Sequence, residues 1–188
     1  MRVIAGRFRG RNLVTPKGLA TRPTTDRIKE TIFNILQNHV PGSNFLDLYA
    51  GSGQIGIEAL SRGAKHVCLV DSSRDAKSAI ESNMNTLKIQ EECTFLNRDC
   101  LSAIASFPSD MTFDLVFMDP PYKDEKEDEI LKSLLAKNCL HKNSLIVIEA
   151  DLHRDFSFVE GLGYQIERIK KYKTNQHIFL SLKKTDVI

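Results

Sequence analysis

The sequence predicts an α/β protein built on a mostly parallel β-sheet with helices on both faces. Short apolar runs alternate with stretches of helical spacing, which is the pattern of successive βα units. Strands are expected at Phe45–Tyr49, His66–Val70, Thr94–Leu96, Phe113–Met118 and Leu145–Glu149, with helices near 54–62, 73–88, 100–107 and 127–137. The last two apolar runs, Tyr164–Tyr172 and His177–Leu182, are joined by so short a turn that they must pair antiparallel.

The start of the chain predicts a small basic extension. Residues 1–15 alternate weakly around Gly6 and Gly10, as in a β-hairpin. The segment 23–40 opens with Pro and Thr and then repeats isoleucines at helical spacing, which predicts an amphipathic helix ended by Pro41-Gly42. We therefore divide the chain into a hairpin-and-helix extension, residues 1–40, and a main domain, residues 41–188.

Composition is that of a globular protein, with 188 residues, of which 41% are hydrophobic and 27% charged. No apolar run approaches the roughly 20 residues that span a bilayer, and no apolar stretch typical of a secretory signal follows the basic N-terminus. The four cysteines are scattered without a CxxC pair or neighbouring histidines. We therefore expect a cytoplasmic protein with reduced, buried thiols, no membrane contact and no metal.

Basic residues gather at the two ends of a chain whose net charge is only +2. Residues 1–25 carry six basic side chains and no acidic one, and residues 168–173 add four more. This distribution indicates an anionic partner, with nucleic acid the first candidate. A solvated basic rim explains the charge equally well.

A glycine-rich turn follows the first predicted strand of the sheet. Gly51 and Gly53 let the backbone turn sharply and approach a ligand closely, and ligands of open α/β sheets bind at the carboxyl ends of strands. The spacing of Gly51, Gly53 and Gly56, with Asp71 about 20 residues later, also satisfies the dinucleotide fingerprint. A dehydrogenase is therefore an alternative on this motif alone.

Acidic residues at three successive strand ends favour S-adenosylmethionine as the cofactor. Asp47 would attract the methionyl ammonium and repel a pyrophosphate. Asp71 can accept hydrogen bonds from both ribose hydroxyls, and Asp99 can accept one from the adenine amino group. Each aspartate could instead be a helix N-cap or a surface charge. The expected cofactor site is completed by the neighbouring residues Tyr49, Ser52 and Ser72.

The fourth predicted strand runs into Asp119-Pro120-Pro121-Tyr122, which suits methyl transfer to an exocyclic amine on an aromatic ring. Such an amine is a poor nucleophile because its lone pair is delocalised, so it needs hydrogen-bond acceptors on its N–H groups. Asp119 and the carbonyl of Pro120 can accept these bonds. The paired prolines fix both φ angles, so the acceptors are held in place beforehand. Tyr122 offers a face on which a base can stack. A proline-terminated strand with a turn is the structural alternative.

These motifs resemble the RsmD family, bacterial 16S ribosomal RNA (guanine-966 N2)-methyltransferases. The likeness runs over nearly the whole chain and is carried by MRVIAGRFRGRNL at the start, RPTTDRIKETIFNIL at 22–36, LDLYAGSGQIGIEALSRGA at 46–64, and DPPY at 119–122. It implies a class I S-adenosylmethionine-dependent methyltransferase fold with a Rossmann-like seven-stranded sheet. It further implies N2-methylation of a guanine in 16S rRNA, in an assembling or assembled small ribosomal subunit, by a protein that we expect to be a monomer.

The resemblance places Arg22 and Thr24 at the border of the pocket. The basic ends would hold RNA phosphates with little sequence readout, through Arg7, Arg9, Arg11, Lys171 and Lys173. The chain departs from the family pattern at Tyr49, where Phe is frequent, and at Asp71, where Glu is frequent. An adenine-N6 DNA or RNA amino-methyltransferase, a protein glutamine methyltransferase and a non-catalytic RNA-binding domain remain alternatives.

Overall fold

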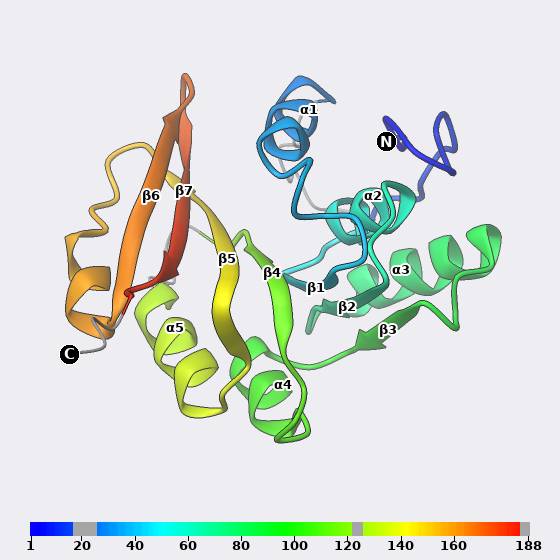
Figure 1. Cartoon of the computed structure of the whole chain (residues 1–188). Coiled ribbons are helices and arrows are strands. Elements are labelled where there is room, and N and C mark those ends of the chain that lie inside the picture. Colours follow the sequence, from blue (N-terminus) through cyan, green and yellow to red (C-terminus); the bar gives the residue numbers. More distant parts are fainter. Residues whose placement is uncertain (17–25, 122–125, 185–188) are drawn as a thin grey trace.

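The computed structural model of the chain describes residues 1–16, 26–121 and 126–184. Its centre is a seven-stranded sheet in the order β3-β2-β1-β4-β5-β7-β6 (Figure 1). The strands are β1 (Asn44–Leu48), β2 (His66–Val70), β3 (Cys93–Leu96), β4 (Phe113–Met118), β5 (Leu140–Asp151), β6 (Tyr164–Lys171) and β7 (Asn175–Leu182). Strands β1 to β5 pair in parallel, and β7 runs antiparallel to both β5 and β6. The predicted parallel sheet with a reversed last hairpin is confirmed.

Helices cover the two faces of the sheet as two separate apolar cores. One core lies against α4 (Cys100–Ser106) and α5 (Glu127–Ala136), and η1 (Ser157–Leu162) joins it. The other lies against α1 (Asp26–Ile35), α2 (Gln54–Ser61) and α3 (Arg74–Leu87) (Figure 1). Side chains alternate between the cores along each strand, so that Phe45 faces α2 while Leu46 faces α4. None of the helices in the described ranges has the length and apolar character of a membrane span.

Most boundaries lie within one or two residues of those predicted, and three elements differ more. The described helix α1 ends at Ile35 rather than at Val40, and residues 36–40 form turns and bends; the position before Pro41 accounts for the non-helical backbone of Val40 alone. Strand β5 begins at Leu140 and ends at Asp151, beyond both predicted limits. The N-terminal hairpin consists of one antiparallel bridge, between Arg2 and Asn12, because Gly6 and Gly10 adopt positive φ angles and turn the chain before strands can extend.

The N-terminal segment is held against α2 by one buried carboxylate. Glu58 has no exposed surface. Its oxygens accept hydrogen bonds from the backbone N–H groups of Ile4 at 2.7 Å and Ala5 at 3.0 Å. Arg62 donates a third bond at 2.8 Å. Residues 1–16 therefore form part of the packed molecule, and the division of the chain at residue 40 stays a prediction.

Candidate functional site

Two loops leave the sheet side by side where the strand order reverses. Strands β1 and β4 are parallel neighbours, with Leu48 in register with Met118. The glycine-rich turn follows β1, and Asp119 with its two prolines follows β4, so both loops start at the same edge of adjacent strands (Figure 1). This is the point at which open α/β sheets bind ligands. The sequence predicted these two loops, and the strand order brings them together.

The turn after β1 depends on backbone that most residues avoid. Tyr49, Gly51 and Gly53 have φ angles of 63°, 58° and 76°. A Cβ atom on Gly53 would lie 2.9 Å from a methyl carbon of Leu69. A Cβ on Gly56 would collide with side chains of β2. The glycines therefore let α2 start close to the sheet, with its N–H groups directed towards the turn.

Asp47 is buried beneath this turn, with 1% of its surface exposed. Its Oδ2 accepts a hydrogen bond from the backbone N–H of Gly56 at 2.8 Å. Burial raises the pKa of Asp47 to about 7. The carboxyl therefore holds the first turn of α2 in place, and this structural contact adds to the ligand contact predicted for it.

Asp71 joins the turn after β1 to the loop after β2. Its Oδ2 accepts a bond from Gly51 N–H and its Oδ1 accepts one from Ser73 N–H, both at 2.8 Å. The side chain is half-buried. Each carboxylate oxygen has a second lone pair, so Asp71 can still accept the ribose hydroxyls predicted from the sequence.

A cavity of about 130 Å³ adjoins Asp71. Its walls include four predicted cofactor residues: Tyr49, Asp71, Ser72 and Asp99. Asp99 is the N-cap of α4, and its Oδ1 accepts a bond from Ser102 N–H at 2.9 Å. Bonds from Ser102 hold the pKa of Asp99 below its usual range. The capping alternative for Asp99 is thus observed, at a position that also faces the cavity.

Replacement of Asp71 by Ala should weaken binding of the cofactor by about 1–3 kcal/mol, the cost of losing a charged hydrogen bond. Titration calorimetry with S-adenosylhomocysteine measures this directly. Asp75→Ala, which removes an exposed carboxylate from the first turn of α3, serves as the matched control. Equal affinities for the two variants would remove Asp71 from the cofactor site.

Asp119 lies beside a second carboxylate that the sequence did not single out. Met118 of β4 is in register with Ile148 of β5, so the next residues, Asp119 and Glu149, are neighbours on the face that also carries Asp47. Burial, with the nearby charges of Glu149 and Asp47, raises the pKa of Asp119 to about 8. A half-buried carboxyl with such a pKa at a strand end is a candidate functional group.

Glu149 is held by a hydrogen-bonded network of side chains from β7 and the turn before it. Glu149 is 7% exposed, and its Oε1 accepts a bond from Asn175 Nδ2 at 2.6 Å. Its Oε2 lies 3.1 Å from Nε2 of the fully buried His177. The other ring nitrogen of His177 lies 3.2 Å from the hydroxyl of Tyr172. In the sequence, Glu149 was recognisable only as an acidic residue at the end of an apolar strand. The network itself could not be predicted, because it depends on β7 lying next to β5.

The predicted RNA contacts are distributed unevenly. Arg7 stacks on Phe8 and forms an ion pair with Glu92 at 2.8 Å, whereas Arg9 and Arg11 are exposed beside it. On the hairpin, Lys171 and Lys173 are also exposed. Among the described residues there is no group of three or more His, Cys, Asp or Glu side chains placed to hold a metal ion. The predicted residues that lie outside the described ranges are Arg22, Thr24 and Tyr122.

The strand order, the reversed β7 and the glycine turn at the switch point define a class I methyltransferase fold. Comparison with known proteins agrees. The model of the family described as Conserved hypothetical protein 95 matches residues 1–181. The chain belongs to this family, the RsmD family.

Relatives match over most of their length. The ribosomal RNA small subunit methyltransferase D of Haemophilus influenzae is 37% identical over 152 residues, which cover 80% of this chain and 79% of the relative. Its namesake from Escherichia coli K12 is 34% identical, with 81% and 75% covered. The solved structure of yhhF from Escherichia coli superposes with a TM-score of 0.87 at 31% identity, over 98% of this chain and 99% of that one.

Proposed function

We propose that this protein transfers a methyl group from S-adenosylmethionine to the N2 amine of a guanine in small-subunit ribosomal RNA. The observation that carries the proposal is the start of both loops at adjacent strand ends, with Leu48 in register with Met118. A cofactor at the first loop would face an amine at the second. The names of the relatives support ribosomal RNA as the substrate, and the choice of guanine N2 rests on the family likeness.

Residues around the first loop fit the cofactor. Asp71 and Asp99 face one cavity and offer acceptors for hydroxyl and amino groups. Gln54, the first residue of α2, has a buried side-chain oxygen without a hydrogen-bond partner among the described residues, which suits a ligand that brings N–H donors. When bound, S-adenosylmethionine supplies an electrophilic methyl group on a sulfonium.

The proposed role of the second loop is to bind and orient the amine. Asp119 and the carbonyl of Pro120 accept its N–H bonds and direct the lone pair towards the methyl group. Ionised Asp119 accepts more strongly than the neutral acid, so its ionisation favours transfer. Glu149 is a positioning residue in this scheme, because its charge adds to burial, the larger cause, in raising the pKa of Asp119.

The pH dependence tests this role. We expect kcat/KM, which reports groups of the free enzyme, to rise with pH around a midpoint near the Asp119 pKa of about 8. Glu149→Gln removes a neighbouring negative charge, so the midpoint should move to lower pH. Glu129→Gln, an exposed change on α5, should leave it in place. An identical midpoint in wild type and Glu149→Gln would refute the coupling.

The free energy of unfolding should also depend on pH through Asp119. Folding raises the pKa of Asp119, so its contribution is present at low pH and is lost as pH rises from about 4 towards 8. The side chain at this position cannot ionise in the Asp119→Asn variant. The free energy of unfolding of this variant should therefore increase relative to that of wild type as pH rises from about 4 towards 8. Urea unfolding at several pH values measures the gap.

Identification of the modified base tests the whole proposal. Small-subunit RNA from cells that lack the enzyme is incubated with it and isotope-labelled cofactor, and the labelled nucleoside is identified by mass spectrometry. N2-methylguanine supports the assignment, whereas N6-methyladenine would replace it with the adenine alternative. Labelling of a peptide glutamine in place of RNA would favour the protein methyltransferase.

A further inference from the structure

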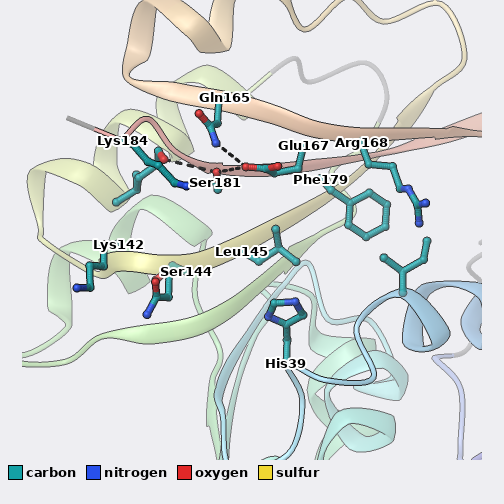
Figure 2. A pocket seen from close by; sticks show the side chains of 13 residues that line it. His39, Lys142, Ser144, Leu145, Gln165, Glu167, Arg168, Phe179, Ser181 and Lys184 are labelled. Carbon is teal, nitrogen blue, oxygen red and sulfur yellow. Dashed lines mark hydrogen bonds between the residues drawn. The ribbon is translucent and has the colours of Figure 1, made fainter. Parts of the chain in front are cut away.

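A second cavity, of about 530 Å³, lies on the α1 side of the hairpin end of the sheet. Figure 2 shows its lining, drawn from α1, β5, β6 and β7. Leu145 and Ile35 provide partly exposed apolar surface, next to the nearly buried Phe179. Basic side chains surround it: His39, Lys142, Arg168 and Lys184. We call this cavity the hairpin groove.

An irregularity in β6 sets which charges face the hairpin groove. The register between β6 and β7 shifts between Ile166 and Arg168. Strict alternation would send Glu167 and Arg168 to opposite faces, but both line the groove. Bulges redirect side chains in this way and are frequent next to active sites. Arg168 therefore stands opposite Phe179, on the groove side.

The same pairing places one further basic residue of β6 level with the proposed methyl-transfer site. Two residues further along β6, Lys170 is in register with His177, which is in register with Glu149. Residues two apart on a strand lie on one face, about 7 Å from each other. Arg168 is thus one such step from the row of Glu149, whose β4 neighbour is Asp119. Lys171 pairs with Gln176 and faces the opposite side.

The charge of the hairpin groove is positive. Among the described residues that line it, one is acidic: Glu167, which accepts bonds from Gln165 Nε2 at 2.5 Å and Ser181 Oγ at 2.6 Å. These bonds hold the pKa of Glu167 below its usual range. Arg168 and Lys142 are exposed and form no ion pair within the described part of the chain. Both remain available to an anionic ligand.

We propose that the hairpin groove holds the single-stranded RNA next to the target base, with Arg168 and Lys142 contacting its phosphates. A cationic groove with apolar surface is the usual means of binding single strands, because phosphates and base faces are satisfied together. The inference rests on the proposed function, since it takes the RNA substrate from there. It adds a place for that RNA beside β6, from the groove to Lys170, which the buried His177 of β7 and Glu149 of β5 separate from Asp119.

RNA binding under varied salt tests the proposal. The probe is a fluorescein-labelled single-stranded oligouridine, titrated by anisotropy between about 50 and 200 mM KCl. Arg168→Glu and Lys142→Glu should each weaken binding about tenfold or more and reduce the log–log salt slope by about 0.7, the value for one phosphate contact on a single strand. Lys65→Glu carries the same charge change at an exposed position directly before β2, which β1 and β4 separate from β5, and should match wild type.

Two further measurements separate the possible outcomes. Unchanged thermal unfolding and S-adenosylhomocysteine affinity show that the variants fold. Variants that fold and bind RNA with the affinity and slope of wild type would overturn the proposal. Loss of binding to polyglutamate, with RNA binding intact, would assign the groove to an acidic protein and also overturn it. If RNA binding depends on the groove but wild type methylates no ribosomal RNA, the proposed function is refuted, whereas the proposal that the groove binds RNA is supported.

Discussion

Asp119→Ala should lower the rate of methyl transfer by about 100- to 1000-fold, the usual cost of removing one preorganised hydrogen-bonding group from a reacting centre. The amine would lose the acceptor at the end of β4 and keep only the backbone carbonyl of Pro120. Affinity for S-adenosylhomocysteine should change little, because the proposed cofactor contacts lie on the loops after β1, β2 and β3. Single-turnover transfer to RNA measures the rate, and calorimetry measures the affinity.

Two variants give this experiment its controls. Asp119→Asn keeps an acceptor oxygen without the charge, so it should retain more activity than Asp119→Ala. Asp110→Ala removes an exposed aspartate near the amino end of β4 and should behave as wild type. Full turnover by Asp119→Ala would refute the role proposed for Asp119 as an acceptor at the amine.

Glu58→Ala should reduce the free energy of unfolding by about 3–5 kcal/mol, the range for removing one partner from a buried ion pair. Arg62 would lose its partner, and the N–H groups of Ile4 and Ala5 would lose their acceptor. Urea unfolding followed by circular dichroism measures the loss. Glu81→Ala breaks an exposed pair with Lys77, and such pairs contribute at most about 1 kcal/mol. Equal losses in the two variants would contradict the importance of the buried contact.

Much of the fold could be predicted because the chain repeats one pattern. Each apolar run is followed by a helix with an apolar face, and that repetition predicts a parallel sheet without knowledge of distant contacts. The reversed hairpin followed from the short turn before β7. The position of the N-terminal segment on α2 could not be predicted, because it depends on Glu58, more than 50 residues away along the chain.

The two loops of the candidate site could be predicted to share one pocket, but the residues that support them could not. Gly51 and Asp119 stand in recognisable motifs, so sequence was sufficient to select them. Glu149 and His177 stand in no motif, and only the neighbouring positions of β4, β5 and β7 bring them to Asp119. The choice of Arg168 and Lys170 over Lys171 likewise depends on the register shift in β6, which no charge count reveals.

Asn83 of α3 connects the N-terminal segment to the glycine turn of the proposed cofactor site. Its side-chain nitrogen donates to the carbonyls of Ser52 at 2.9 Å and Val14 at 3.0 Å, and its oxygen accepts from Val14 N–H at 2.8 Å. A displacement of the N-terminal segment by bound RNA would thus be transmitted to the glycine turn through one amide. Thermodynamic linkage makes any such effect reciprocal, so each ligand would alter the affinity of the other by the same factor, whichever is added first.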